Sequence, residues 1–423
     1  MITFRLSQRV SSYAANLSIY FLASLIPMLL SLVSNPFVAK NMSPHDYAIV
    51  GYYSAFVTLF TPFINFFFAH YYTKRFYELN DGEKTILKAT IFKSFISLSF
   101  VMALGAMGIL LMYNILANKS SDIPFLPYAF LAIVRIPLSC IYTLELVDYK
   151  MRRQSKKYFH LSVTNGMMVT SLMVLFVVLF KWGAFGNLSA SLTATTFLFG
   201  FVIYRNRGLL SIPMNWNTVR EAAMFCWPIV IASMLAFFST GYDKVMLERT
   251  GDLTMLGYYS VGVSIAAYVN VFSDSINSTF QSDIFENIVK RDFRKTFMIV
   301  AMKLAMTLLI VGCFILLAPY IIDILTYGRY VNSTKFAIIT SLASITSMLY
   351  YTVSQIAIAF GYSSITLINK ILGSVLSVVT YHVIIEQYGA TGAAWGMVVS
   401  YIYLFLGGSV MVASKYYLNK RKH

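Results

Sequence analysis

Residues 297–318 read FMIVAMKLAMTLLIVGCFILLA, an apolar run that contains a single charged side chain, Lys303. A helix of about 20 such residues crosses the hydrocarbon core of a bilayer. The run has no alternation of apolar and polar residues, and an open sheet cannot satisfy its backbone hydrogen bonds in lipid. We therefore interpret this stretch as a transmembrane helix.

Similar runs recur along the whole chain of 423 residues, of which 58% are hydrophobic and 12% are charged. A soluble domain is about half apolar and about a quarter charged, so the composition excludes an ordinary soluble protein. The sequence predicts an all-α polytopic membrane protein with twelve transmembrane helices. We expect these at 13–34, 47–69, 91–113, 124–147, 160–180, 184–204, 221–241, 254–278, 297–318, 335–358, 363–385 and 390–413.

The basic residues are unevenly distributed between the two sides of this predicted bundle. Alternate segments, counted from the N-terminus, carry 22 Lys and Arg, and the intervening segments carry 6. Lys93 and Lys335 lie at the ends of predicted helices, and Arg135, Lys303 and Lys370 lie deeper inside. Because basic loops stay on the cytoplasmic side, both termini are expected in the cytoplasm. The formal charge of +16 therefore indicates membrane orientation and contact with lipid headgroups, and we expect no nucleic acid partner.

Three features recur at one offset of 206 residues. Gly51-Tyr52-Tyr53-Ser54 returns as Gly257-Tyr258-Tyr259-Ser260, and the motif GAFG at 183–186 returns as GATG at 389–392. The basic pair Lys84 and Lys88 returns as Lys290 and Arg294. The shared offset predicts two six-helix halves, 1–206 and 207–423. Six crossings return the chain to its starting side, so the halves are expected to be parallel, around a central cavity.

Three stretches carry a resemblance: NPFVA at 35–39 followed by Tyr47 and Gly51, YDKVML at 242–247 followed by 257–260, and YGATGAA at 388–394. They resemble a known family, the multidrug/oligosaccharidyl-lipid/polysaccharide (MOP) exporter superfamily, and within it the Wzx-type O-antigen flippases. One position departs from the family pattern, because Lys244 stands where an arginine often follows the aspartate. A lysine keeps the charge but lacks the planar fork of a guanidinium.

The resemblance implies a bacterial inner-membrane flippase that moves an undecaprenyl-pyrophosphate-linked oligosaccharide, such as an O-antigen or capsule repeat unit, from the cytoplasmic to the periplasmic leaflet. It also implies alternating access and polysaccharide polymerase machinery among the partners. Membrane lipids surround such a protein, and a monomer is compatible with the sequence. We expect no cofactor and no metal site; the coupling ion of such a transporter would be H⁺ or Na⁺.

Three cations lie inside predicted helices, where an ionisable side chain costs about 2.5–3.5 kcal/mol or more. Arg135 lies midway along the fourth helix, and a guanidinium matches the geometry of a phosphate. We interpret it as an anchor for the substrate pyrophosphate; the alternative is a structural ion pair with Glu145 or another carboxylate. Lys303 and Lys370 are further candidates for a cationic cavity, although Lys303 could instead extend to the interface.

The acidic candidates are assigned to coupling or gating. Asp274 lies in a polar stripe of the eighth helix and is a candidate carrier of a coupling ion. Asp243 and Lys244 lie at the outer end of the seventh helix, where an interfacial ion pair is the alternative. Glu145 and Asp148 lie near the inner end of the fourth helix, and with the basic loop that follows they are candidates for a gate.

Two other classes of function remain open. A drug/cation antiporter of the same superfamily would need clustered carboxylates, and Asp274 is the one deep carboxylate here. A polytopic glycan-processing enzyme would need a catalytic constellation, and the short loops contain no acid–base pair or metal motif. We therefore expect a transporter that is not an enzyme.

Overall fold

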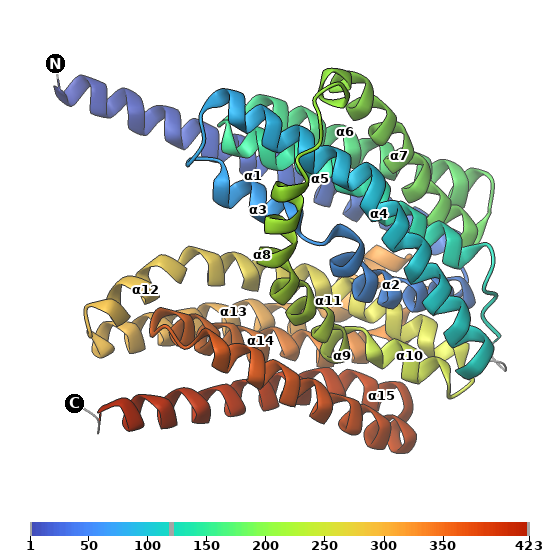
Figure 1. Ribbon diagram of the computed structural model, residues 1–423. Coiled ribbons are helices and arrows are strands. Elements are labelled where there is room, and N and C mark those ends of the chain that lie inside the picture. The colour runs from blue at the N-terminus through green and yellow to red at the C-terminus, as the bar shows by residue number, and fades with distance from the viewer. Residues whose placement is uncertain (1, 118–121, 421–423) are drawn as a thin grey trace. The chain divides into compact units, whose positions relative to one another are not determined.

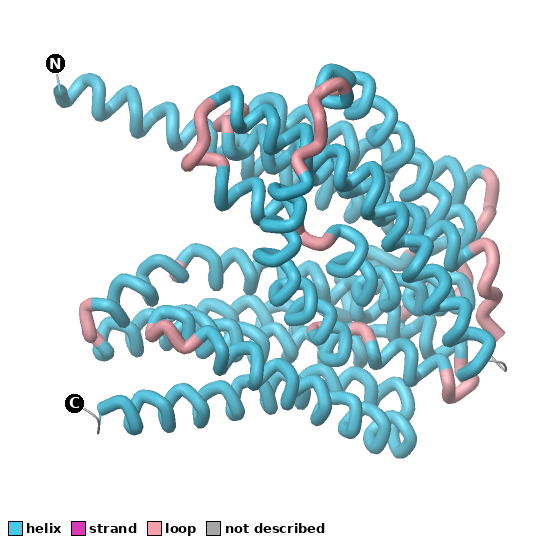
Figure 2. The backbone as a smooth tube through the Cα atoms, viewed as in Figure 1, coloured by secondary structure: helices cyan, strands magenta, loops and turns pink. Residues whose placement is uncertain are grey.

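The computed structural model describes residues 2–117 and 122–420, and within them the chain is helical with no β-strand. Figure 2 shows helices joined by short loops. This agrees with the predicted all-α class and has a simple cause. In lipid no water is available to a backbone amide, so each crossing segment must form its hydrogen bonds within itself.

The helices form two compact units. Unit 1 comprises residues 1–42 and 60–231, and unit 2 comprises residues 43–59 and 232–423. The predicted halves, 1–206 and 207–423, stay a prediction, as do their parallel orientation and the cavity between them. The first part of the helix at 44–65 belongs to unit 2. The helix at 216–235 passes from unit 1 to unit 2 after residue 231.

Unit 1 contains most of the helices of the N-terminal part of the chain. Its elements are α1 (Ile2–Asn41), α3 (Phe68–Arg75), α4 (Asp81–Ala117), α5 (Tyr128–Met151), α6 (Ser155–Met173), the π-helical η1 (Val174–Leu179), α7 (Gly183–Arg205), the short η2 (Arg207–Leu210) and most of α8 (Trp216–Leu235). Its largest buried side chains are aromatic, including Tyr72, Phe92 and Phe95, which belong to one apolar cluster with Leu144. Figure 1 shows these elements in blue to green.

Unit 2 contains the remaining helices. Its elements are the first part of α2 (Pro44–Asn65), α9 (Phe237–Thr240), α10 (Tyr242–Glu248), α11 (Leu253–Thr279), α12 (Gln281–Val289), α13 (Phe293–Thr326), the short η3 (Val331–Ser333), α14 (Thr334–Ala359) and α15 (Ser363–Lys420). Helix α15 contacts α14 and the short α10, and α14 also packs on α11 and α13. Helix α14 is therefore surrounded by its neighbours.

Eleven helical segments of the described chain are long and apolar enough to cross a membrane, which identifies a multi-pass membrane protein. Ten of them each contain or overlap one predicted span. The last, Ser364–Leu418, contains the twelfth predicted span and all but the first residue of the eleventh. It is not one straight helix, because Gly389 interrupts it with φ 56° and ψ −134°. The number twelve itself stays a prediction.

The turn glycines of the sequence repeat share an unusual backbone conformation. Gly183 has φ 52°, and Gly389, 206 residues later, has φ 56°. Residues with a side chain rarely adopt this left-handed region, so a glycine here lets the chain reverse with hardly any loop. The short gap between the predicted spans 160–180 and 184–204 is a tight turn in the structure: α7 begins at Gly183, directly after Lys181 and Trp182.

The two copies of the Gly-Tyr-Tyr-Ser motif lie against each other within unit 2. A methyl group added at Gly51 would overlap the side chain of Ser260, and one added at Gly257 would lie 2.6 Å from the carbonyl carbon of Pro44. Helices α2 and α11 therefore touch at their repeated glycines. Small residues at such crossings allow backbones to approach closely, which is a main source of helix association in lipid.

Candidate functional site

Arg135 lies midway along α5 and is half-buried. It forms no hydrogen bond or ion pair with any side chain in the described parts of the chain. Glu145, its proposed structural partner, instead binds Lys88. The interpretation of Arg135 as one member of a pair with Glu145 is therefore wrong. What remains is a guanidinium in a membrane-spanning segment that pairs with no anion of the described residues. This is costly unless a ligand supplies an anion or water solvates the charge.

The other two candidate cations differ from each other. Lys370 of α15 is half-buried, and its ammonium group has no partner among the described residues. Lys303 of α13 is fully buried, and its Nζ donates hydrogen bonds to Thr352 Oγ1 at 2.8 Å and to Gln355 Oε1 at 3.4 Å. Lys303 does not extend to the interface; it joins α13 to α14. Because Arg135 belongs to unit 1 and both lysines belong to unit 2, a shared cationic site stays a prediction.

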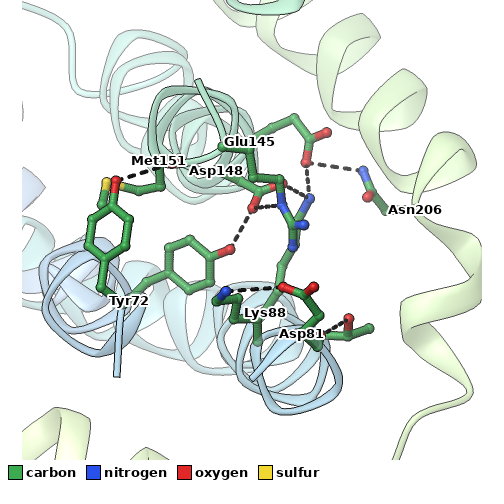
Figure 3. A network of polar contacts seen from close by, with 11 residues as sticks. Tyr72, Asp81, Lys88, Glu145, Asp148, Met151 and Asn206 are labelled. Atoms are coloured by element: carbon green, nitrogen blue, oxygen red, sulfur yellow. Dashed lines mark hydrogen bonds and ion pairs between the residues drawn. The ribbon is translucent and has the colours of Figure 1, made fainter. Parts of the chain in front are cut away.

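Glu145 and Asp148 belong to a buried network in unit 1 (Figure 3). Lys88 of α4 donates to Glu145 Oε2 and to Asp148 Oδ2, both at 2.8 Å. Asp148 Oδ1 accepts from Arg152 Nε at 2.7 Å and from the Tyr72 hydroxyl at 2.5 Å. Two carboxylates thus face two cations, which satisfies the requirement that buried charges be paired and hydrogen-bonded.

Two further contacts surround this network. Asn206, directly after α7, donates from Nδ2 to Glu145 Oε2 at 3.3 Å. Burial, and then the proximity of Asp148, raises the pKa of Tyr72, so its hydroxyl stays a hydrogen-bond donor at neutral pH. The network therefore ties α3, α4 and α5 to the end of α7. The structure brings Glu145 and Asp148 together with Arg152 of the basic loop, as predicted, while their role as a gate stays a prediction.

Lys88 is the cation of the network that the sequence analysis does not assign to a site; Tyr72 and Asn206 are not assigned either. Lys88 was counted with the loop charges, whereas α4 begins at Asp81 and already includes it. A signal is present at the end of α5: Glu145, Asp148 and Arg152, the residue that follows the helix, recur at intervals of three and four residues, so they lie on one side of it. Two acids and one base on a buried face require a second cation, and the nearby helix α4 supplies it.

A second tyrosine on α3 also binds a carboxylate. The hydroxyl of Tyr71 donates to Glu221 Oε2 of α8 at 2.7 Å. Burial, and then this hydrogen bond, raises the pKa of Tyr71 to about 12. Consecutive tyrosines thus fix α3 to two different helices, since Tyr72 contacts α5. Neither contact follows from the local sequence pattern, which is equally compatible with an interfacial aromatic belt.

Asp243 and Lys244 do not bind each other through their side chains within ion-pair distance. Asp243 is fully buried, accepts a hydrogen bond from the Tyr259 hydroxyl, and leaves Oδ1 without a partner among the described residues. Lys244 donates from Nζ to Ser54 Oγ at 3.2 Å. The alternative of an interfacial ion pair between these two residues is therefore wrong. Ser54 and Tyr259 belong to the two copies of the repeated motif, so both charges bind at the crossing of α2 and α11.

Asp274 lines a cavity of about 200 Å³ inside unit 2, between α11, α14 and α15. Asn270, one turn earlier, accepts a hydrogen bond from Ser344 Oγ at 2.6 Å and lines the same cavity. The aromatic rings of Tyr351 and Tyr401 complete one wall. Two residues of the predicted polar stripe of α11, Asn270 and Asp274, therefore line this cavity, and Asp274 is exposed. A carboxylate beside hydroxyl, amide and aromatic groups suits a cation or a polar ligand.

These residues offer binding chemistry and no visible reaction centre. Among the described residues, no group of three or more His, Cys, Asp or Glu side chains could hold a metal ion. The free cysteines Cys140 and Cys226 are buried, and Cys313 is exposed. The ionisable groups described above fall into three kinds: single cations without a partner, a buried network of paired charges, and one carboxylate that lines a cavity.

Comparison with solved structures gives the fold. A MATE-family multidrug transporter of the MOP superfamily, in an inward-facing conformation, aligns with a TM-score of 0.69 and 13% identity over 93% of this chain and 98% of that chain. The lipid II flippase MurJ aligns with a TM-score of 0.68 and 16% identity over 93% of this chain and 87% of that chain. The MATE transporter VcmN from Vibrio cholerae, as a D35N mutant, aligns with a TM-score of 0.56 and 14% identity over 96% and 98%.

Sequence comparison gives the family. No curated protein sequence matches this chain. The family model described as "Polysaccharide biosynthesis protein" matches residues 13–281, which is more than half of the chain. Its match begins in α1 and ends at the start of α12, so it covers the buried ion network and both copies of the Gly-Tyr-Tyr-Ser motif. With the fold of the MOP superfamily transporters and this match, the chain belongs to the polysaccharide biosynthesis protein family.

Proposed function

We propose that this protein is a flippase for a lipid-linked oligosaccharide. Its substrate is an O-antigen or capsule repeat unit on undecaprenyl pyrophosphate, moved from the cytoplasmic to the periplasmic leaflet of a bacterial inner membrane. The family assignment and the similarity in fold to MurJ, a lipid II flippase, support this proposal. It includes cytoplasmic termini, alternating access of two parallel halves, and transport without enzymatic catalysis.

The unpaired charge of Arg135 is the observation that supports the proposal most directly. It is a cation in a membrane-spanning segment that no carboxylate of the described chain neutralises. A pyrophosphate supplies the missing anion, and a guanidinium binds it through two parallel hydrogen bonds. Lys370, equally without a partner, is proposed to contribute a second positive charge. Lys303 is proposed as a third contact, which would require that its bonds to Thr352 and Gln355 open.

The acidic residues are proposed to link transport to an ion gradient of H⁺ or Na⁺. Asp274 is the proposed carrier, because its carboxylate lines a cavity and has no basic partner among the described residues. Asp243 and Lys244 are proposed to respond to movement at the crossing of α2 and α11. Glu145 and Asp148, with the basic loop that follows α5, are proposed to form a gate at this end of the helix. Components of polysaccharide polymerase machinery are proposed partners.

The test is glycan export in cells that depend on this chain. Arg135→Ala is expected to abolish export while the amount of membrane-inserted protein stays unchanged. The matched control is Lys181→Ala, which removes one cation from the turn before α7. Unimpaired export by Arg135→Ala would exclude Arg135 as a contact of the substrate. Unchanged glycan export after deletion of the gene for this protein would contradict the proposed function.

One observation favours a second candidate, a drug/cation antiporter. The cavity at Asp274 combines a carboxylate with Tyr351 and Tyr401, and such a lining attracts organic cations. Under this alternative, overexpression raises resistance to cationic drugs, and Asp274→Asn abolishes the resistance. The flippase proposal predicts no such resistance.

A further inference from the structure

A groove of about 440 Å³ runs between α6 and α7 of unit 1. The proposed flippase function makes no use of it. Its walls are mainly apolar, and three basic side chains complete the lining. The lining residues are Lys157, His160, Leu161, Thr164, Met168, Phe197, Leu198, Phe201 and Arg205.

The basic and apolar groups are separated along the groove. Lys157 and His160 lie in the first two turns of α6, which begins at Ser155, and Arg205 is the last residue of α7. The two helices form a hairpin, so all three basic residues lie at its open end. Phe197 and Phe201 lie further toward the turn, and their side chains are 62% and 52% exposed. Large apolar groups exposed on a membrane-spanning helix face acyl chains.

The basic end has no internal anion. No carboxylate lines the groove, and none of the three basic side chains forms an ion pair with the described residues. The ring of Tyr149 supports two of them: Lys157 Nζ lies 6.0 Å and Arg205 Cζ 5.5 Å from its centroid. A cation–π contact orients a cation without neutralising it. Two positive charges are thus held around one ring and remain available to a phosphate.

We infer that this groove binds one anionic phospholipid of the surrounding bilayer. Its headgroup phosphate contacts Lys157, His160 and Arg205, and an acyl chain lies along Phe201 and Phe197. The positive charges select an anionic headgroup, and the apolar walls of the groove accept an acyl chain of the lipid. Basic pockets between transmembrane helices, on the cytoplasmic side, are suited to anionic lipid headgroups. The predicted topology places this end of the hairpin on that side.

A second groove of nearly the same size provides an internal comparison. It measures about 420 Å³, lies in unit 2, and is lined by aromatic and aliphatic groups such as Phe293, Phe360 and Tyr416, with no charged side chain. It can accept an acyl chain but has no means of selecting a headgroup. The preference for an anionic lipid therefore belongs to the groove between α6 and α7.

The bound lipid would also stabilise the buried network nearby. Arg205 precedes Asn206, whose amide donates to Glu145 at 3.3 Å. A phosphate that holds Arg205 restrains the end of α7 and, through Asn206, the position of Glu145. The lipid thus connects the membrane surface to the ion network of unit 1, independently of the transported substrate.

Native mass spectrometry of the purified full chain tests this inference. Phosphatidylglycerol and phosphatidylcholine with identical acyl chains are titrated against wild type and the double variant Lys157→Gln/Arg205→Gln. Removing two cations near a lipid surface is expected to lower the affinity for phosphatidylglycerol about thirtyfold, which corresponds to about 2 kcal/mol. Affinity for phosphatidylcholine is expected to stay within about twofold.

The matched control is Lys290→Gln/Lys295→Gln, which removes two exposed cations that are already paired with Glu286 and Asp292. It should leave the preference for phosphatidylglycerol unchanged. A photoreactive phosphatidylglycerol on wild type adds a measurement that needs no variant, and cross-links are expected within residues 155–205.

Equal affinities of wild type for the two lipids, or cross-links confined to other helices, would overturn the inference. So would labelling of the groove by a photoreactive undecaprenyl phosphate but not by phosphatidylglycerol, since the groove would then belong to the transported lipid. None of these three results depends on glycan export, so the lipid site and the proposed function can fail separately.

Discussion

Lys88 Nζ lies 2.8 Å from Asp148 Oδ2, and both side chains are buried between α4 and α5. Lys88→Met would leave Asp148 with Arg152 and Glu145 with an amide alone. Removing one member of a buried ion network costs about 3–5 kcal/mol, because the remaining charge is unpaired. Thermal unfolding in detergent should show a large fall in the midpoint.

The control is Lys84→Met, which removes a neighbouring cation whose partner Asp81 is largely exposed, so it should hardly change the midpoint. Equal midpoints for the two variants would contradict the structural role of Lys88.

The glycine crossing of α2 and α11 gives a second prediction. Gly257→Ala places a methyl group against the backbone of Pro44, which cannot move aside as a side chain can. Overpacking of this kind costs about 1–3 kcal/mol. Gly105→Ala on α4 is the control, since a methyl group there meets nothing within 4 Å. We expect a lower unfolding midpoint for Gly257→Ala alone; an unchanged midpoint would mean that the two helices do not cross closely at this residue.

Lys303 allows its structural and transport roles to be separated. Lys303→Met keeps most of the side-chain volume and removes the cost of burying a charge, while Thr352 Oγ1 keeps its hydrogen bond to the Met348 carbonyl. We expect the unfolding midpoint to change little and transport to fall if the ammonium contacts substrate. Lys303→Ala also leaves a cavity and should lower the midpoint, by an amount that corresponds to about 2–5 kcal/mol. Full transport by Lys303→Met would exclude Lys303 from the substrate site.

Asp274 gives a prediction about coupling. Its carboxylate lines a cavity and pairs with no base of the described chain, so Asp274→Asn should leave stability unchanged. If the residue carries the coupling ion, transport by this variant no longer responds to an imposed H⁺ or Na⁺ gradient. Proteoliposomes with and without each gradient measure this. A variant that keeps the full gradient response would exclude Asp274 as the carrier.

The sequence predicted the local features of this fold well. The apolar runs locate the helices because each must satisfy its hydrogen bonds within lipid, and the paired glycines at 183 and 389 locate the turns because few other residues adopt that conformation. The limits of α4 were predicted less well, because its first turns are polar and resemble a loop. Lys88 was consequently grouped with the loop charges.

The long-range contacts could not be predicted in the same way. Lys244 binds Ser54, which is 190 residues away in the chain, and Lys303 binds Thr352 on another helix. Helices that are apolar on every face give little periodic contrast, so the face a charged residue presents is not encoded locally. The candidates Arg135 and Lys370 could be found from their depth alone, but their lack of partners required the packed structure.

The most direct test of the central claim is translocation in vesicles. Purified chain, wild type or Arg135→Gln, is reconstituted with an undecaprenyl-pyrophosphate-linked oligosaccharide, and accessibility of the glycan to an external cleaving enzyme is followed over time, with and without an ion gradient. The account predicts protein-dependent translocation by wild type, and at least a tenfold slower rate for Arg135→Gln, because a charge-assisted phosphate contact contributes about 1.5–3 kcal/mol. Absence of translocation by wild type under every gradient would contradict the flippase function, and an unchanged rate for Arg135→Gln would contradict the cationic site.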